Sequence, residues 1–330
     1  MNKAEGSMDA IYRDESGGGL IMRPYTMPLC LAGQVRIRVA YTGINRADVL
    51  QCDGGYPPPI SGICGLEVSG IIDAIGEGVH DWAIGQHVCA LLSEGGYAPY
   101  VTVDARHLLA VGGVVSDTIA ASLVEALATS WLALCDVGKI CADEHVLIHG
   151  GASGVGMIAL QVARYLGAHT YTMASSDAKN DLCRSLGVTV IPWDRHPETL
   201  AQQIKIYAPQ GLDIVWDILG GAYVGAHLKT LAYGGRLLSV ACMDGAQVQC
   251  SMGGLLMKNL AWHGVTLRSQ SDDRKAEIIA AVRDYLWDAC HEGIIAPHIY
   301  KVVPPYEVMH AHELMRQRTH YGKMLIEWAD

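Results

Sequence analysis

The chain has 330 residues, which at about 150 residues per domain predicts two domains and excludes a single small binding module. Its 34 acidic and 24 basic residues give a formal net charge of −10, and no run rich in lysine and arginine offsets that excess. This charge excludes the basic surface typical of proteins that bind nucleic acids or anionic membranes, so we expect a small-molecule partner.

The start of the chain shows no targeting pattern. Residues 1–7 are polar with no apolar segment behind them, and no uninterrupted run of about 18 apolar residues occurs. We therefore expect a soluble, cytoplasmic protein with no membrane partner, although residues 1–7 equally fit a leader or tag remnant before a natural start at Met8. The ten cysteines are scattered without a Cys-x-x-Cys pair, which predicts reduced and mostly buried thiols.

Short alternating strands separated by glycine and proline turns dominate the first part of the chain. The pattern predicts strands at residues 35–39, 68–72, 88–92 and 97–103. From residue 122 the pattern changes to a helix over 123–135, followed by alternating strands and helices. The sequence thus predicts an α/β protein with a β-rich first domain and a doubly wound second domain.

A glycine-rich segment lies between an apolar run at residues 146–148 and a helical pattern over 157–166. Gly151 and Gly156 match the first and third glycines of the dinucleotide-binding motif, while Ser153 replaces the second. A pyrophosphate needs backbone N–H groups and a helix N-terminus at close range, and side chains at the turn would hold it away. We therefore expect a nicotinamide dinucleotide to contact Gly151, Ala152, Ser153, Gly154, Val155 and Gly156.

A merely structural turn is the alternative for this loop. A strand predicted at residues 170–174 argues against it, because strand, loop, helix and strand then form a βαβ unit of about 30 residues. Further strands are predicted at 189–191, 213–217, 236–240 and 265–267, with helices at 176–186, 198–207 and 222–231. The tail predicts a helix over 273–290, a strand at 299–303, a helix near 306–316 and a strand at 323–326. We expect this last portion to rejoin the first domain.

The end of the strand at 170–174 bears on the choice of cofactor. Folds that prefer NAD place an acidic residue about 20 residues past the loop, where it holds the ribose 2′-hydroxyl. Here Ser175 and Ser176 occupy that place and Lys179 follows, a set that suits the 2′-phosphate of NADPH. Asp177 is the competing signal, and we expect it in the first turn of a helix, where an acidic side chain is favourable.

Short blocks along the chain occur in the order found in one enzyme family. They are residues 45–48 (NRAD), 54–59 (GGYPPP), 65–70 (GLEVSG), 95–97 (GGY), 153–156 (SGVG) with Gln161, 186–187 (LG) and 322–323 (GK). From about residue 10 to 326 the chain resembles the zinc-independent, zeta-crystallin-like quinone oxidoreductases of the medium-chain dehydrogenase/reductase superfamily, and most closely the p53-inducible quinone oxidoreductase group. It departs from the family at Ser153, at Cys64, where relatives usually have proline, and at Pro99, where glutamate is common.

The resemblance implies an architecture and an assembly. It predicts a GroES-like β-rich catalytic domain over residues 1–126, a Rossmann domain with a doubly wound parallel sheet over 127–268, and a return to the catalytic domain over 269–330. It also implies a homodimer that forms through edge strands of the nucleotide-binding sheets.

The resemblance also bears on zinc, which in related alcohol dehydrogenases polarises an alcohol oxygen. The position of the first ligand cysteine is Asn45 here, and the motif that supplies the ligand histidine has Leu66. Leucine cannot bind a metal, and residues 93–110 lack the cysteines of a structural zinc lobe. We therefore expect no metal site, and we expect each histidine to be a surface or core residue.

Matching family positions makes Asn45, Asp48, Tyr56 and Thr129 the candidates for the catalytic pocket. Asn45 and Tyr56 would donate hydrogen bonds to the acceptor oxygen. The structural alternatives stay open: Asn45 and Asp48 fit the N-cap and third position of a short helix, Tyr56 fits a rigid proline turn, and Thr129 fits an ordinary helix.

The family positions also suggest cofactor contacts outside the glycine loop. Relatives that prefer NADPH carry a serine and lysine similar to Ser176 and Lys179. Trp193 lies where relatives place a tyrosine over the phosphate-ribose end, with an ordinary packed tryptophan as the alternative. Cys242 follows the fifth strand of the sheet, where the backbone passes the nicotinamide, and we expect a buried, inert thiol. Lys323 resembles a lysine that contacts the cofactor, with a solvated surface lysine as the alternative.

Without a metal, the easiest hydride acceptor is already electrophilic, as a quinone or an α,β-unsaturated carbonyl is. We therefore expect an NADPH:quinone oxidoreductase that transfers a hydride from the nicotinamide C4 to a quinone in the cleft between the domains. The alternatives are an NADPH-dependent alkenal or enone reductase and a non-catalytic NADPH-binding sensor or structural protein. A quinone or enone is accordingly the expected small-molecule partner.

Overall fold

The computed structural model describes residues 8–14 and 19–328. The segment 1–7, for which the sequence leaves a leader or tag open, lies outside the described residues. The chain divides into two compact units, one formed by Met1–Ala128 with Gln270–Asp330 and the other by Thr129–Ser269. Each unit is described separately below.

The first unit is built on antiparallel strands. Within the described residues, a seven-stranded sheet has the order β14-β15-β3-β4-β5-β7, β6 pairs with β3, and β1 pairs with β2. The strands are β1 (Met8–Arg13), β2 (Leu20–Tyr25), β3 (Gln34–Ile44), β4 (Glu67–Ile75), β5 (His87–Leu91), β6 (Tyr100–Asp104), β7 (Leu108–Ala110), β14 (Ile299–Val303) and β15 (Lys323–Glu327). In β3 the alternate residues Val35, Ile37 and Val39 are buried. Successive side chains of a strand point to opposite faces, so this pattern is expected where one face packs on a core.

The tail of the chain completes this sheet. β15 pairs antiparallel with β3, so that Met324 lies opposite Ile44, and β14 pairs parallel with β15. The strands at 35–39, 68–72, 88–92, 299–303 and 323–326 are thereby confirmed. The strand expected at 97–103 begins three residues later, at Tyr100, because residues 97–99 form a bend at Pro99.

The first unit also contains helices, most of them short. They are α1 (Arg46–Cys52), η1 (Ala105–His107), α2 (Asp117–Ala120), α9 (Asp272–Tyr285), α10 (Trp287–His291), η3 (Pro305–Glu307) and α11 (Val308–Gln317). The helix expected over 273–290 is therefore two helices. The break falls at Leu286, whose φ of −123° leaves the helical region.

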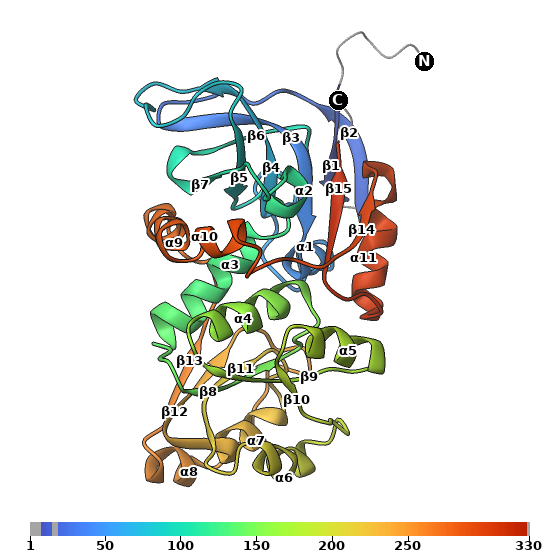
Figure 1. Ribbon diagram of the computed structural model, residues 1–330. Helices are drawn as coiled ribbons and strands as arrows, with labels where there is room; N and C mark the ends of the chain where they lie inside the picture. Colours follow the sequence, from blue (N-terminus) through green and yellow to red (C-terminus); the bar gives the residue numbers. More distant parts are fainter. Residues whose placement is uncertain (1–7, 15–18, 329–330) are drawn as a thin grey trace. The chain divides into compact units, whose positions relative to one another are not determined.

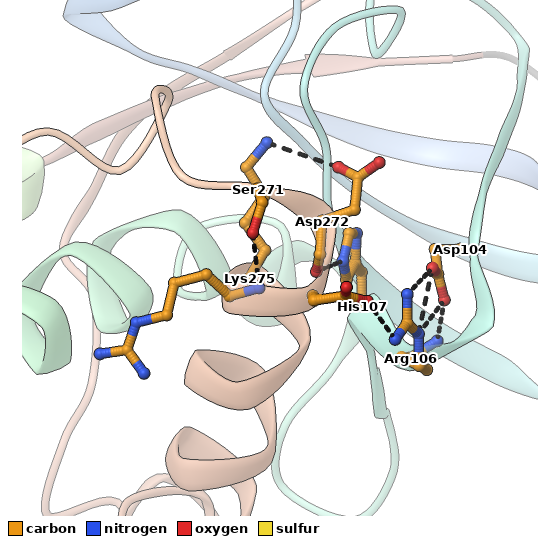
Figure 2. A network of polar contacts seen from close by, with 8 residues as sticks. Asp104, Arg106, His107, Ser271, Asp272 and Lys275 are labelled. Carbon is orange, nitrogen blue, oxygen red and sulfur yellow. Dashed lines mark hydrogen bonds and ion pairs between the residues drawn. The ribbon is translucent and has the colours of Figure 1, made fainter.

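A polar network joins the η1 turn to the start of α9 (Figure 2). Arg106 pairs with Asp104 and with Asp273, each at 2.7 Å, and His107 Nε2 donates to the Asp272 carbonyl at 2.8 Å. Ser271 caps α9 by accepting from the Arg274 N–H. The ion pairs of Arg106 are exposed and contribute little to stability, so these contacts mainly fix the position at which α9 begins.

The second unit contains a parallel sheet. Among the described residues its six strands have the order β10-β9-β8-β11-β12-β13, and every pairing is parallel. The strands are β8 (His145–His149), β9 (His169–Met173), β10 (Thr189–Val190), β11 (Leu212–Asp217), β12 (Leu231–Ser239) and β13 (Ala261–Gly264). Five of the expected strands are confirmed, but the strand expected at 265–267 is wrong. Residues 261–264 pair with β12 instead, and the Val265 N–H extends that pairing by donating to the Ser239 carbonyl.

Helices cover both faces of this sheet. Figure 1 shows α4 and α5 on one side and α6, α7 and α8 on the other, the doubly wound arrangement that the sequence predicts. The helices are α4 (Gly154–Tyr165), α5 (Asp177–Ser185), α6 (Pro197–Tyr207), α7 (Tyr223–Thr230) and α8 (Met252–Met257). The strands contribute Leu147, Val215 and Leu237 to a buried core that also includes Val224 of α7 and Leu200 of α6.

The expected helix over 123–135 consists of α3 (Val124–Ser130) and a π-helical segment, η2 (Trp131–Val137). The wider turn is visible in the bond from Gly138 N–H to the Ala133 carbonyl, which spans five residues at 2.8 Å. Over the described residues, the stretch Asp117–Val137 is long and apolar enough to cross a membrane by length and composition alone. Because 72% of its most apolar 18-residue window is buried inside the protein, it is weak evidence for a membrane span and has the burial of a core helix.

Candidate nucleotide site and candidate pocket residues

The glycine loop connects β8 to α4 in the second unit. Ser153 is the N-cap of α4, and its hydroxyl accepts a hydrogen bond from Gly156 N–H at 3.1 Å. Ala152 is buried, whereas Gly154 and Val155 form the first turn of the helix. The replacement of the motif's second glycine by Ser153 thus supplies a helix cap. The 12-residue helix directs its N-terminal dipole at the loop, as an anion site requires.

The glycines of this loop are required by close packing. A Cβ at Gly156 would lie 2.2 Å from the Gly150 carbonyl oxygen, and a Cβ at Gly151 would lie 2.3 Å from Thr172 Oγ1. Thr172 holds the loop from β9, because its hydroxyl donates to the Ile148 carbonyl and accepts from Gly151 N–H. The loop therefore has the small residues that a bound pyrophosphate needs at the positions where the motif places them.

The end of β9 presents hydroxyl and basic groups. Ser176 is exposed and caps α5, with Lys179 N–H 3.5 Å from its hydroxyl. Asp177 lies in the first turn of α5, which confirms that expectation. Arg195, which the sequence did not single out, is exposed and donates to the Ser175 carbonyl at 2.7 Å. It comes from the loop after β10, so no local pattern could bring it beside Ser175.

A buried polar cluster lies directly beneath the glycine loop. His149, at the end of β8, and His227, on α7, approach at 2.9 Å between their Nε2 atoms, so one ring donates and the other accepts. Burial lowers the pKa of His149 to about 4 and that of His227 well below its ordinary value. Both rings are therefore neutral at pH 7. Asp217 lies 3.6 Å from His227 Nδ1, and burial raises the pKa of its carboxyl.

Trp193 and Cys242 differ in their surroundings, because Trp193 packs against other rings and Cys242 is exposed. Trp193 packs edge-on against His149 and Tyr223, each with ring centroids 5.9 Å apart, so the aromatic packing alternative is observed. Whether it also covers a cofactor stays a prediction. Cys242 is exposed, so the expectation of a buried thiol is wrong. It lies three residues beyond the end of β12, in a loop whose backbone passes close to Gly220.

The first unit brings three of the predicted residues together. Asn45 is the N-cap of α1, and Asp48 completes a capping box by accepting from Asn45 N–H at 2.7 Å. The second Asp48 oxygen accepts from Gly65 N–H at 3.0 Å. Burial raises the pKa of Asp48 to about 7, although these two backbone bonds and nearby Lys323 act in the opposite direction. The structural alternative for Asp48, a helix-capping role, is therefore observed.

Lys323 is buried, which rules out the solvated surface lysine. Only 4% of it is exposed, and its ammonium bonds to Glu67 and, at 2.6 Å, to Asn45 Oδ1. Glu67 is fully buried and also accepts from Asn45 Nδ2 at 2.9 Å and from Glu125 N–H at 3.0 Å. In the sequence, Glu67 stands out only as a member of the 65–70 segment, and no local pattern indicates that it binds Lys323. A role for Lys323 at the cofactor stays a prediction.

Tyr56 and Thr129 complete the predicted pocket set. Tyr56 is half-buried in the turn that follows α1, beside the three prolines. Thr129 is buried in α3 and belongs to the second unit. Within residues 8–14 and 19–328, no group of three or more histidine, cysteine or acidic side chains is arranged to hold a metal ion.

Two protein families match consecutive parts of the chain. The alcohol dehydrogenase GroES-like domain matches residues 31–113, and the zinc-binding dehydrogenase domain matches residues 154–283. The synaptic vesicle membrane protein VAT-1 homolog of Rattus norvegicus is 32% identical over 322 residues, which are 92% of this chain and 79% of that protein.

Polyketide synthases also contain a similar segment. The polyketide synthase GfsB of Streptomyces halstedii is 33% identical over 294 residues, or 89% of this chain. The chain spans only 5% of that protein, and 14% of a mycocerosic acid synthase-like polyketide synthase of Mycobacterium tuberculosis.

Solved structures agree with the fold along the whole chain. A mycobacterial protein complexed with NADPH superimposes with a TM-score of 0.88 at 25% identity, covering 97% of this chain and 100% of that one. The CurK enoyl reductase gives a TM-score of 0.85 at 26% identity, covering 97% and 99%. These matches confirm the α/β fold with a GroES-like domain and a Rossmann-type parallel sheet. The chain belongs to the medium-chain dehydrogenase/reductase superfamily of nicotinamide-dependent oxidoreductases.

Proposed function

We propose that this protein is a zinc-independent, NADPH-dependent reductase of quinones. The observation that carries the proposal is the buried cluster of Asn45, Glu67 and Lys323. A catalytic zinc needs at least three donor side chains around an open position. Here the neighbouring Leu66 offers no donor, and an ammonium group already bonds both Asn45 and Glu67. A second cation would meet the Lys323 charge, so this set of side chains does not fit a metal.

The acceptor must therefore be electrophilic without metal assistance. A bound nicotinamide supplies the hydride, and a quinone accepts it because its oxygens tolerate the resulting charge. On the protein side, Lys323 donates to the Asn45 amide oxygen and Glu67 accepts from the amide nitrogen, so the amide is held in one orientation. Its dipole is therefore already oriented before the acceptor oxygen gains charge. One Asn45 N–H is bonded to Glu67, and the other meets only the Gly43 carbonyl at a long 3.5 Å. We propose that this second N–H and the half-buried Tyr56 donate hydrogen bonds to the acceptor oxygen, and that water or a nearby hydroxyl delivers the proton.

The preference for NADPH rests on the end of β9. The Ser176 hydroxyl is exposed, Lys179 follows in the first turn of α5, and the Arg195 guanidinium is tied to the Ser175 carbonyl. These groups provide two positive charges and a hydroxyl, which suit a phosphate more than a ribose hydroxyl. The nearby Asp194 carboxylate could repel a phosphate, but it already accepts hydrogen bonds from the Thr199 hydroxyl and His196 N–H. These bonds hold it in place and partly offset its charge.

A second candidate is an NADPH-dependent enone or enoyl reductase. The likeness to the CurK enoyl reductase and to segments of polyketide synthases favours it. The two reactions use the same hydride donor and differ in whether a C=C bond is saturated or a quinol is made. A non-catalytic NADPH-binding protein is the remaining alternative.

We also propose that the protein is a homodimer. β13 is an edge strand of the parallel sheet, and an edge strand leaves backbone groups free for another chain. The apolar side chains of Trp262, Met252, Leu256 and Met257 are exposed on β13 and α8. Exposed apolar side chains beside an edge strand would be buried by a second copy of this chain that pairs with β13.

The proposed activity is tested by following NADPH oxidation at its absorbance band. We expect turnover with 9,10-phenanthrenequinone and 1,4-benzoquinone, slower turnover with NADH, and no change after treatment with a chelator. An alkenal is assayed in parallel, and turnover with the alkenal alone would replace the quinone assignment with the enone reductase. Cofactor binding without turnover on any acceptor would favour the non-catalytic alternative.

The cofactor preference is tested with Lys179→Ala and Arg195→Gln. Because each removes a charge-assisted contact worth about 1.5–3 kcal/mol, we expect the KM for NADPH to rise about 10- to 100-fold. The KM for NADH should change little, since NADH has no 2′-phosphate. Lys205→Ala, which removes an exposed lysine from α6 of the same unit, is the control for net charge. Equal effects on both cofactors would remove the varied residue from the 2′-phosphate site.

A further inference from the structure

Two cysteines face each other inside the first unit. Cys52 is the last residue of α1, and Cys64 lies directly before Gly65, whose N–H holds Asp48. Their sulfur atoms are 3.9 Å apart, and the residues are 2% and 0% exposed. The chain between them is an exposed loop that includes Ile60, 99% exposed.

A histidine lies beside this pair. His312 on α11 is fully buried, and its Nε2 is 2.9 Å from the Tyr97 hydroxyl. Its Nδ1 has no hydrogen-bond partner among the described residues. A hydrogen bond with Cys64 and, after the opposing effect of burial, the His312 ring lower the pKa of the Cys52 thiol. Asp53 raises it, and the Asp48 carboxyl and the Tyr97 hydroxyl, whose pKa burial raises well above its ordinary value, lie in the same cluster.

The lowered thiol pKa distinguishes Cys52 from the buried cysteines Cys89 and Cys290. Burial raises the pKa of Cys290 to about 12 and that of Cys89 well above its ordinary value. A thiolate is the nucleophilic form of cysteine, so the hydrogen-bonded pair of Cys52 and Cys64 is set up to react before Cys89 and Cys290. A resolving thiol at 3.9 Å is the second requirement of a redox pair, and Cys64 meets it.

We propose that Cys52 and Cys64 are a redox-active dithiol that closes to a disulfide when a peroxide oxidises Cys52. Neither thiol takes part in the proposed hydride transfer, so the disulfide can be tested without the reductase assay. Closure requires the sulfurs to move from 3.9 Å to about 2.05 Å, a shift that the exposed connecting loop can absorb. Because Cys64 accepts from Tyr97 N–H through its carbonyl and precedes Gly65, closure also pulls on the backbone that holds Asp48.

The reaction balances with one peroxide. The Cys52 thiolate attacks one oxygen of hydrogen peroxide, the O–O bond breaks, and the departing hydroxide takes up a proton to leave as water. Cys52 is then a sulfenic acid. The Cys64 sulfur attacks the Cys52 sulfur, the S–S bond forms, the S–O bond breaks, and the second water carries away the Cys64 proton. Two thiols are oxidised by two electrons, and the peroxide is reduced to two waters.

The wild-type protein provides the first test. The reduced protein is treated with one equivalent of hydrogen peroxide, alkylated, denatured and digested with endoproteinase Asp-N without reduction. The expected product is the peptide of residues 48–52 linked to the peptide of residues 53–72, with a mass two hydrogens below the sum and loss of the link on adding dithiothreitol. Oxidation confined to exposed Cys141 and Cys242, or over-oxidised Cys52 without the link, would overturn the proposal.

Three variants separate chemistry from folding. Cys64→Ser should leave Cys52 as a sulfenic acid that dimedone labels, whereas Cys290→Ser, a buried cysteine of the same unit, should still form the link. His312→Gln should shift the pH profile of Cys52 oxidation to higher pH, which a purely structural role would not do. Dimedone labelling of Cys290 but not of Cys52 in Cys64→Ser would contradict the pairing, and an unchanged pH profile would remove His312 from the site.

Discussion

Replacing Lys323 with methionine is expected to lower the free energy of unfolding of the first unit by about 3–5 kcal/mol. Methionine has a similar volume, so the change mainly removes the charge. The Glu67 carboxylate would remain fully buried with only the Asn45 amide and Glu125 N–H as donors. An unpaired buried charge is far more costly than a lost surface contact. Thermal unfolding should show a decrease in Tm on the order of 10 °C.

Lys301→Met is the matched control for this prediction. Lys301 pairs with Glu307 at 3.6 Å in the same unit, but the two side chains are 39% and 42% exposed. Exposed pairs contribute about 0–1 kcal/mol, so this variant should unfold close to wild type. The double variant Lys323→Met with Glu67→Gln should lose less stability than the sum of the single changes, because neither charge is then unpaired. If Lys323→Met unfolds like Lys301→Met, the buried ion pair does not stabilise the unit.

Replacing Gly156 with valine is expected to raise the Kd for NADPH by at least about 100-fold, equivalent to about 2.7 kcal/mol. The new Cβ would lie 2.2 Å from the Gly150 carbonyl oxygen, which belongs to backbone and cannot turn aside. The start of α4 must therefore move away from β8, and the N–H groups that face the pyrophosphate move with it. NADPH fluorescence titration measures the affinity, and circular dichroism checks that the sheet and helices persist.

The control for the loop is the same substitution at an open position of the same unit. Gly264 ends β13 and has nothing within 4 Å of its Cβ position, so Gly264→Val should bind NADPH like the wild type. Valine also suits a strand. Retained NADPH affinity in a folded Gly156→Val variant would mean that the pyrophosphate lies elsewhere.

The sequence by itself determined the elements whose signals are local. The glycine loop, α4 and the alternating strands and helices around them were predictable because cap residues, periodic apolar positions and small residues lie next to one another in the chain. Even the position of Asp177 followed from its place in a helical turn. The errors fall where local signals are weak. At the edge of the sheet the short, partly exposed residues 261–264 form the strand, and at Leu286 the apolar pattern continues across a break in the backbone.

Only the tertiary structure decided which distant residues meet. Lys323 and Asn45 are 278 positions apart, and the pairing of β15 with β3 buries the lysine against Glu67. The sequence left that lysine open between a surface site and a cofactor contact, because a single residue carries no sign of its burial. The same holds for Arg195 beside Ser175, for the His149 and His227 rings, and for Cys52 beside Cys64. The sequence specifies the chemical type of each side chain. The burial and the hydrogen-bond partners of that side chain depend on contacts between distant segments, which no local pattern predicts.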